Sequence, residues 1–212
     1  MYYPVNLDVR GKSCLVVGGG EVAHRKAKGL LRAGAFPTVL APQVGEKLKR
    51  LGQNRKIRFV RDHFKEKYLK GHFLTVVATD DRETNSLIGQ LCQKRNLLVN
   101  VVDQPEDCTF TVPSLFKRGP LTIAISTNGA SPALSKRIRK ELEKNYGKEF
   151  GEFLSLMVKL RKEAIQRIPT LKARKHRFEK VIASNVLLLL QKGKRSEARQ
   201  RIREILYGKN IS

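Results

Sequence analysis

The stretch from Lys12 to Gly34, KSCLVVGGGEVAHRKAKGLLRAG, constrains the fold more than any other part of the sequence. It begins with Ser13–Val17, a continuous apolar run of the kind that forms a strand buried on both faces of a parallel sheet. Gly18, Gly20 and Ala23 then fit the pattern G-x-G-x-x-G/A. In a dinucleotide-binding turn, the first glycine permits the tight turn, the second lets the backbone approach a pyrophosphate, and the small third residue lets helix and strand pack closely. The pattern alone leaves open a glycine turn that only connects a strand to a helix.

A helix is predicted to begin at Glu21, because apolar and small residues recur at helical spacing from there until Gly34. Such a helix directs its unpaired N–H groups and the positive end of its dipole at the phosphates of a ligand. The next predicted strand, Thr38–Ala41, runs into Pro42 and Gln43. Dinucleotide folds often place an Asp or Glu near this point to bind the ribose hydroxyls. Because that carboxylate is missing here, the choice between NAD and NADP stays open.

Strands and helices alternate through the first half of the chain, which predicts a Rossmann-like, doubly wound parallel sheet of the α/β class. Further strands are expected at residues 57–60, 73–78 and 97–102, with helices at 44–52 and 81–95. The ligand crevice of such a sheet lies beyond the carboxyl ends of its strands. The stretches expected to meet at that edge are Gly18–Val22, Thr79–Asp81 and Asn100–Asp103.

The acidic residues of these stretches allow two interpretations. Asp80 and Asp81 precede a predicted helix, so capping of that helix explains them as well as a functional role does. Asp103 has no helix to cap before Pro105. A functional role is therefore the preferred interpretation for Asp103.

After Asp103 the regular alternation stops. Residues 104–120 contain three prolines and are predicted to form a loop with one brief strand at Thr109–Val112. Leu121–Ser126 is predicted to be the next strand. From residue 149 to residue 207 the pattern indicates helices only, and the apolar residues between 178 and 190 are predicted to lie on one of them.

The turn from Thr127 to Ser131 carries a second candidate site. Ser131 and Pro132 are residue types typical of an N-cap and a first helical position, and the helix is predicted to continue to about Lys144. Two hydroxyls, an amide and several backbone donors before a helix start suit an anion such as a carboxylate. The alternative is a well-capped helix without a ligand.

The net charge of +24 is the unusual feature of the composition. From Lys136 to the end, 22 basic residues stand against 8 acidic ones, so the last third of the chain carries +14 of the excess. Such a field attracts polyanions, whether nucleic acid, an anionic membrane surface or a substrate with many carboxylates. Charge alone does not choose among these partners.

The remaining composition excludes several classes of protein. No apolar run approaches the roughly 20 residues needed to span a bilayer. The first residues do not form a basic region followed by an apolar core, so we expect no secretory signal and a cytoplasmic location. The three cysteines are scattered, which argues against a disulfide framework and against a thiolate metal site. No His, Cys or Glu spacing suits a tight metal cage, so we expect no resident metal.

Four segments together resemble a known family: YPVNLDVRGKSCLVVGGGEVAHRKAKGLLRAGA, ATDD, NVVDQPEDCTFTVPS and GPLTIAISTNGASPALSKRIRKELE. They are similar, in their order, to the precorrin-2 dehydrogenase / sirohydrochlorin ferrochelatase family, which includes the N-terminal half of the multifunctional siroheme synthases. The resemblance covers about Tyr3 to Glu143. The helical tail matches in length and character only.

The resemblance implies a homodimer of chains with three parts: an NAD-binding Rossmann domain at residues 1–112, a dimerisation segment at 113–147, and a helical C-terminal domain at 148–212. It also implies that NAD+ accepts hydride from precorrin-2 to give sirohydrochlorin. In bifunctional members the same cavity inserts ferrous iron. Chelatase activity in this chain, with Fe2+ or Co2+ as the metal substrate, is left open.

The family's functional residues can be placed on this sequence. Its cofactor contacts fall on Gly18, Gly20, Glu21, Val22, Pro42, Gln43, Thr79 and Asp80. Its aspartate needed for both reactions falls on Asp103, where a carboxylate can serve as a base. Thr127 stands where some fused synthases carry a serine. The candidate substrate-binding residues are Asn100, Thr127, Asn128, Gly129 and Ser131.

Two other functions fit parts of the sequence. A dinucleotide-sensing nucleic-acid binder would use the basic tail, but no recognised nucleic-acid-binding motif accompanies that charge. A non-catalytic carrier would bind the tetrapyrrole without converting it. The prediction is the dehydrogenase, with a tetrapyrrole as its partner and neither nucleic acid nor membrane.

Overall fold

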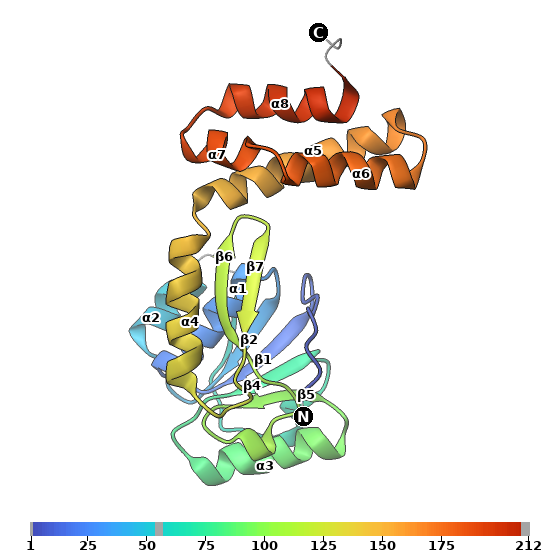
Figure 1. Cartoon of the computed structure of the whole chain (residues 1–212). Coiled ribbons are helices and arrows are strands. Elements are labelled where there is room, and N and C mark those ends of the chain that lie inside the picture. Colours follow the sequence, from blue (N-terminus) through green and yellow to red (C-terminus); the bar gives the residue numbers. More distant parts are fainter. Residues whose placement is uncertain (1, 54–56, 209–212) are drawn as a thin grey trace. The chain divides into compact units, whose positions relative to one another are not determined.

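The computed structural model of the chain describes residues 2–53 and 57–208. The chain divides into two compact units, residues 1–112 and 113–212 (Figure 1). Each unit has an apolar core of its own. In the described part of the chain no helix combines the length and the apolar character that a membrane span requires.

The first unit contains a five-stranded sheet with the strand order β3-β2-β1-β4-β5, in which all neighbours are parallel. Its strands are β1 (Ser13–Val17), β2 (Phe36–Leu40), β3 (Arg58–Val60), β4 (Leu74–Val77) and β5 (Leu98–Val101). The order reverses between β1 and β4, and a reversal of this kind is where open α/β sheets bind their ligands. The predicted doubly wound sheet is confirmed.

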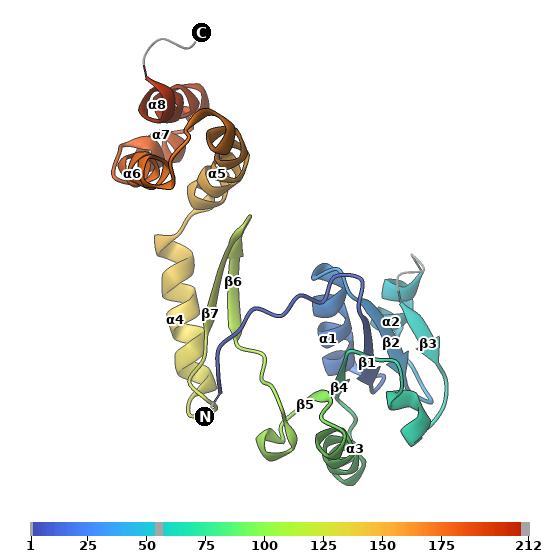
Figure 2. The same cartoon turned by 90° about the vertical axis from the view of Figure 1, so that its right-hand side faces the viewer.

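Helices cover both faces of this sheet (Figure 2). They are α1 (Glu21–Arg32), α2 (Glu46–Gly52) and α3 (Arg82–Lys94), together with the short 3-10 helices η1 (Glu66–Leu69) and η2 (Pro105–Asp107). Cys14 and Val16 of β1 pack in one core cluster with side chains of α1 and α2, whereas Leu15 and Val17 pack in another with side chains of α3 and η1. Burial on both faces is the reason that β1 has no polar residue at alternate positions.

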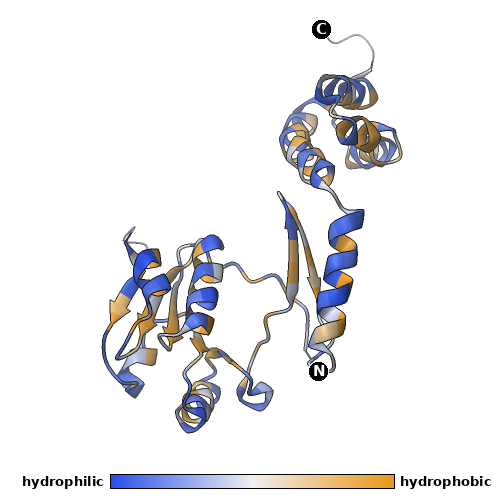
Figure 3. Ribbon diagram, turned by 90° about the vertical axis from the view of Figure 1, so that its left-hand side faces the viewer, coloured by the Kyte–Doolittle hydropathy of each residue, from blue (hydrophilic) through white to orange (hydrophobic). Residues whose placement is uncertain are grey.

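The second unit begins with an antiparallel hairpin of β6 (Ser114–Arg118) and β7 (Leu121–Ile125), and α4 (Pro132–Asn145) lies beside it in both views (Figures 1 and 2). Four more helices follow: α5 (Lys148–Arg167), α6 (Leu171–Ile182), α7 (Val186–Gln191) and α8 (Arg195–Tyr207). They share one apolar core, and they carry hydrophilic as well as hydrophobic residues (Figure 3). The predicted all-helical tail is confirmed.

Two predictions about the chain after Asp103 are wrong. The brief strand expected at Thr109–Val112 does not form, because Thr109 is engaged with β5: its Oγ1 accepts from the Val99 N–H at 2.8 Å, and its N–H donates to the Val99 carbonyl at 2.9 Å. The strand lies later, at β6, inside the predicted loop. Gly119 has φ +54° in the two-residue turn that joins β6 to β7, so the glycine and proline there form a hairpin turn and not a loop.

The single helix expected between residues 178 and 190 is also wrong, since the structure has α6 and α7 there. Ser184 lies in the break between them. Its Oγ donates to the Val181 carbonyl at 2.7 Å, and its own N–H donates to the same carbonyl at 3.2 Å. This local turn ends α6 and lets the next apolar turn pack from a different direction.

Candidate functional site

A cleft of about 480 Å³ lies at the carboxyl ends of β1, β4 and β5. The residues that line it are Gly20, Glu21, Val22, Ala78, Thr79, Asp80, Arg82, Asn85, Val102, Asp103 and Gln104. The sheet thus brings together the glycine turn, the start of the α3 segment and the end of β5, as the topology predicts. Six of the predicted site residues line this cleft: Gly20, Glu21, Val22, Thr79, Asp80 and Asp103.

The glycine turn fits closely between neighbouring strand ends. Gly18 has φ +124°, and a Cβ atom there would overlap the Ala78 carbonyl at the end of β4. A Cβ atom at Gly19 would overlap the Gln43 carbonyl. The glycine motif treats that position as variable, so sequence reasoning missed Gly19. At Gly20, by contrast, an added Cβ would meet no atom within 4 Å.

Helix α1 starts without an internal cap. Its N-cap residue is Gly20, which has no side chain, and no side-chain hydrogen bond caps the helix. The first N–H groups of the helix therefore remain available at the cleft, together with the positive end of the helix dipole. Glu21 adds one carboxylate there, which forms a 2.9 Å ion pair with Lys47.

The segment after β4 is held by Asn85, a residue that sequence reasoning missed. Thr79 Oγ1 donates to Asn85 Oδ1 at 2.6 Å, and Asn85 Nδ2 donates to the Thr79 carbonyl at 3.0 Å. Asn85 is buried. A buried amide on a helix face that packs against the sheet is a signal that the sequence does offer, because such a group requires hydrogen-bond partners.

Asp80 and Asp81 differ in their placement. Asp80 lines the cleft, whereas Asp81 is the N-cap of α3 and its carboxylate accepts from the Glu83 N–H at 3.1 Å. Hydrogen bonds, the strongest from Thr84, lower the pKa of Asp81 from its ordinary value. The capping interpretation is therefore confirmed for Asp81.

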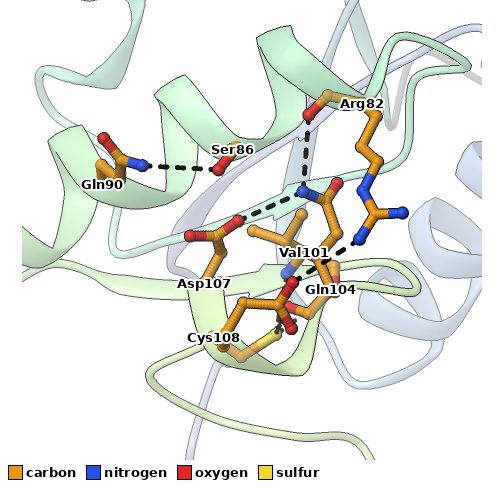
Figure 4. Close-up of polar contacts among 8 residues, drawn as sticks. Arg82, Ser86, Gln90, Val101, Gln104, Asp107 and Cys108 are labelled. Carbon is orange, nitrogen blue, oxygen red and sulfur yellow. Dashed lines mark hydrogen bonds and ion pairs between the residues drawn. The ribbon is translucent and has the colours of Figure 1, made fainter.

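Asp103 follows β5 on a turn whose neighbours are fixed. Its φ of +60° is unusual for a residue with a side chain. The buried Gln104 donates through Nε2 to the Arg82 carbonyl at 3.4 Å and to Asp107 Oδ2 at 3.2 Å (Figure 4). Cys108 Sγ accepts from the Val101 N–H at 3.1 Å in the same view. These contacts hold the backbone that presents the exposed Asp103 carboxylate to the cleft.

Eight of the predicted residues lie outside the lining of the cleft: Gly18, Pro42, Gln43, Asn100, Thr127, Asn128, Gly129 and Ser131. Pro42 and Gln43 follow β2 and are exposed, and the Gln43 carbonyl adjoins Gly19. Asn100, within β5, is only 7% exposed and accepts a hydrogen bond from Lys26 Nζ at 2.7 Å. Sequence reasoning missed Lys26, although its position on the otherwise apolar stripe of α1 marks it as a charge that needs a partner.

The Thr127–Ser131 turn belongs to the second unit. Ser131 Oγ accepts from the Leu134 N–H at 3.2 Å, so α4 has a side-chain cap. Thr127 Oγ1 donates to the Ser131 carbonyl at 3.1 Å. Asn128 and Gly129 have φ of +50° and +85°. The predicted N-cap of α4 is confirmed, and a contact of this turn with substrate stays a prediction.

Three family models match consecutive parts of the chain. They are described as "Putative NAD(P)-binding" at residues 5–114, "Sirohaem biosynthesis protein central" at residues 118–145 and "Sirohaem synthase dimerisation region" at residues 149–206. A solved structure described as "SirC, precorrin-2 dehydrogenase" aligns over 96% of this chain and 100% of its own, with a TM-score of 0.78 and 36% sequence identity. The chain belongs to the precorrin-2 dehydrogenase / sirohydrochlorin ferrochelatase family.

Curated relatives in this family are described as siroheme synthases. That of Pseudoalteromonas translucida is 36% identical over 98% of this chain and 44% of its own length. That of Photobacterium profundum is 34% identical over 95% of this chain and 43% of its own length. The chain thus spans less than half the length of these relatives. The predicted family is confirmed, and the similarity extends through the helical tail.

The family assignment also bears on the two units. The first is an NAD(P)-binding unit, which confirms the cofactor class predicted from the glycine turn. The second carries the dimerisation region of a family that processes tetrapyrroles. Within the described residues no group of three or more His, Cys, Asp or Glu side chains is arranged to hold a metal ion.

Proposed function

We propose that this chain catalyses the NAD-dependent dehydrogenation of precorrin-2 to sirohydrochlorin in siroheme biosynthesis. The observation that carries the proposal is the cleft in which the uncapped start of α1 and the Asp103 carboxylate occur together. An uncapped helix start binds phosphate through its backbone N–H groups, and a carboxylate accepts a proton. The similarity to a solved precorrin-2 dehydrogenase supports the choice of substrate.

The residues of the cleft fit a dinucleotide. Gly20 leaves open space where a side chain would stand, and the N–H groups of Glu21 and Val22 are not capped by any side chain of α1. These groups would hold the pyrophosphate, with Thr79 and Asp80 as further contacts and Pro42 and Gln43 beside the turn. When bound, NAD+ supplies the hydride acceptor.

Asp103 is the proposed catalytic base. Removing hydrogen from the substrate releases a hydride and a proton, and the carboxylate of Asp103 takes the proton at the carbon skeleton held in the cleft. Its fixed backbone, anchored by Gln104 and Cys108, limits the directions in which the carboxylate points. Substrate contacts by Asn100, Thr127, Asn128, Gly129 and Ser131 remain part of the proposal.

The decisive experiment incubates the purified protein with precorrin-2 and NAD+ and measures NADH and sirohydrochlorin by their absorption spectra. We expect stoichiometric formation of both. Asp103→Ala and Asp103→Asn should lower the rate by about 100-fold or more, the usual contribution of a general base, while NAD+ binding stays nearly intact. Asp81→Asn, which keeps a helix cap outside the cleft lining, is the matched control. Sirohydrochlorin binding without NADH formation would identify a non-catalytic carrier instead.

Adding Fe2+ or Co2+ to the same mixture tests the chelatase activity, with the metal ion as a substrate. A siroheme or cobalt-sirohydrochlorin spectrum that depends on the enzyme would establish it, and Asp103→Ala should abolish it if one carboxylate serves both reactions. The dimerisation region supports a homodimer. We also propose the division of the chain at residues 112 and 147 and a cytoplasmic location, which limited proteolysis and cell fractionation can test.

A further inference from the structure

Helix α1 carries one lysine that points inward. Lys26 lies one helical turn after Val22, so both occupy the same side of the helix. The Lys26 side chain is partly buried, and its Nζ donates to Asn100 Oδ1 of β5 at 2.7 Å. Lys28, two residues later, is exposed. The inward position therefore belongs to Lys26 and is not a general property of this basic helix.

The acceptor for Lys26 is fixed in orientation. Asn100 is 7% exposed, and its Nδ2 donates to the Phe110 carbonyl at 3.2 Å and lies 3.6 Å from Cys108 Sγ. Because the amide nitrogen already has acceptors on one side, the amide oxygen must face Lys26. The strand thus presents a neutral acceptor to a cation.

This ammonium has few partners. A lysine has three N–H donors, and within residues 2–53 and 57–208 the one hydrogen-bond acceptor for Nζ is Asn100 Oδ1. In the same residues no carboxylate lies within ion-pair distance of it. Burial, followed by the charge of Arg25, lowers the pKa of Lys26, while Cys108 and Asp103 act in the opposite direction. A partly buried cation with unused donors favours an anionic ligand.

The position of Lys26 argues against a phosphate of the cofactor as that ligand. The pyrophosphate is expected at the start of α1, and Lys26 lies six positions after Gly20, which is about 9 Å along the axis at roughly 1.5 Å per residue. Asp103, the proposed base, follows β5, the strand whose Asn100 binds the Lys26 ammonium. We therefore expect the anionic ligand of Lys26 to be a group of the substrate on which Asp103 acts.

We propose that Lys26 binds a carboxylate of the tetrapyrrole substrate and so orients the ring with respect to Asp103. This inference rests on the proposed function, because it takes the substrate class from there. Asn100 is then a positioning residue that directs the ammonium, and both residues lie beside the cleft lining and not in it.

The test compares Lys26→Gln, Lys26→Arg and Lys28→Gln with the unchanged protein. Glutamine keeps a donor for Asn100 without the charge, arginine keeps the charge, and Lys28→Gln removes an equal charge from an exposed site on the same helix. For Lys26→Gln we expect the KM for precorrin-2 to rise about 10- to 100-fold, the effect of losing a charge-assisted hydrogen bond, with kcat and the KM for NAD+ within about threefold. Lys26→Arg should retain most of the affinity, and Lys28→Gln all of it.

Other outcomes overturn the proposal in distinguishable ways. A rise in the KM for NAD+ alone would assign Lys26 to a cofactor phosphate, and a fall in kcat with an unchanged KM for precorrin-2 would make it a positioning residue for Asp103. Equal parameters in all variants would leave it no role. If the unchanged protein forms no NADH, the proposed function fails, and sirohydrochlorin binding decides the matter: weaker binding by Lys26→Gln alone supports the carboxylate contact, and equal or absent binding refutes it.

Discussion

Two strand-to-helix turns in this chain look alike in sequence and differ in structure. The turn before α1 and the turn before α4 each combine glycine with a helix start, and both suit an anion on sequence grounds. Before α1 the N-cap is Gly20, which caps nothing. Before α4 the N-cap is Ser131, whose hydroxyl accepts from the Leu134 N–H at 3.2 Å.

The difference lies in where the N–H groups of the first turn find acceptors. Each helix start has N–H groups without partners in the helix. A serine satisfies one of them from within the chain, while a glycine leaves them all for water or a ligand. The α3 start, on the same sheet edge as α1, is capped by Asp81. Of these three helix starts, only that of α1 lacks a side-chain cap, and the proposed function depends on that property.

The largest expected effect is on the free energy of unfolding, and it should differ between the two turns. Gly18→Ala combines a positive φ with an overlap between Cβ and the Ala78 carbonyl, so we expect a loss of about 3 kcal/mol or more in the free energy of unfolding. Gly129→Ala, in the other turn, has φ +85° but open space around the Cβ position, so strain alone should cost about 1 kcal/mol. Urea denaturation of both variants measures the difference. Equal losses would mean that the glycine turn tolerates a side chain by shifting β4.

An aspartate in place of Gly20 should cap α1, so that its start resembles the capped start of α4. Gly20 has φ −87° and open space at its Cβ position, so Gly20→Asp leaves the fold intact. The new carboxylate takes up a first-turn N–H and repels the pyrophosphate, for which we expect about 2 kcal/mol, or a roughly 30-fold rise in the dissociation constant for NAD+.

Gly20→Ser is the control for this change. It adds the cap without the charge and should weaken NAD+ binding less than the aspartate does. Calorimetric titration with NAD+ separates the two variants. If both bind as tightly as the unchanged protein, the pyrophosphate does not lie at the start of α1.

Local pattern was enough to predict most of the first unit. The apolar run of β1 and the helical spacing after Glu21 reflect burial on two faces and on one stripe, and both are properties of neighbouring residues. The meeting of Thr79 and Asp103 at one cleft followed from parallel topology alone. The fold prediction was correct although Pro42 and Gln43 offer no carboxylate, because the fold depends on the glycines and not on the ribose contact.

What the sequence could not predict depends on pairing over long distances. Lys26 and Asn100 are 74 positions apart, and their hydrogen bond exists because α1 packs on β1 and β4, from where the Lys26 side chain reaches β5. The side chain of Thr109 favours a strand by propensity, yet it bonds to β5 in an irregular segment. Pro120 was one of the three prolines that predicted a loop, although Gly119 and Pro120 form a hairpin turn between two strands.

Removing the cap of α4 tests whether this helix start is held by its own side chain and has no part in NAD+ binding. Ser131→Ala deletes the acceptor for the Leu134 N–H, so we expect a loss of about 1 kcal/mol in the free energy of unfolding. The dissociation constant for NAD+ should not change. Ser131→Asp, which restores a cap with a charge favoured at a helix start, should recover the lost stability. If Ser131→Ala is as stable as the unchanged protein, Thr127 alone holds this turn.

The smallest effect concerns the charge of the α3 cap. Hydrogen bonds from Thr84 and then from the backbone lower the pKa of Asp81 in the folded chain. A carboxylate with a lowered folded pKa adds stability above its unfolded pKa of roughly 4, and this contribution is lost as the pH falls through the folded value. Asp81→Asn keeps the cap but cannot titrate, so its stability deficit should be visible at pH 7 and should shrink when the pH is lowered below about 4. Urea denaturation at both pH values measures it. A deficit independent of pH would mean that Asp81 acts on α3 through its hydrogen-bonding geometry, and that charge at this edge of the sheet matters only where a ligand binds.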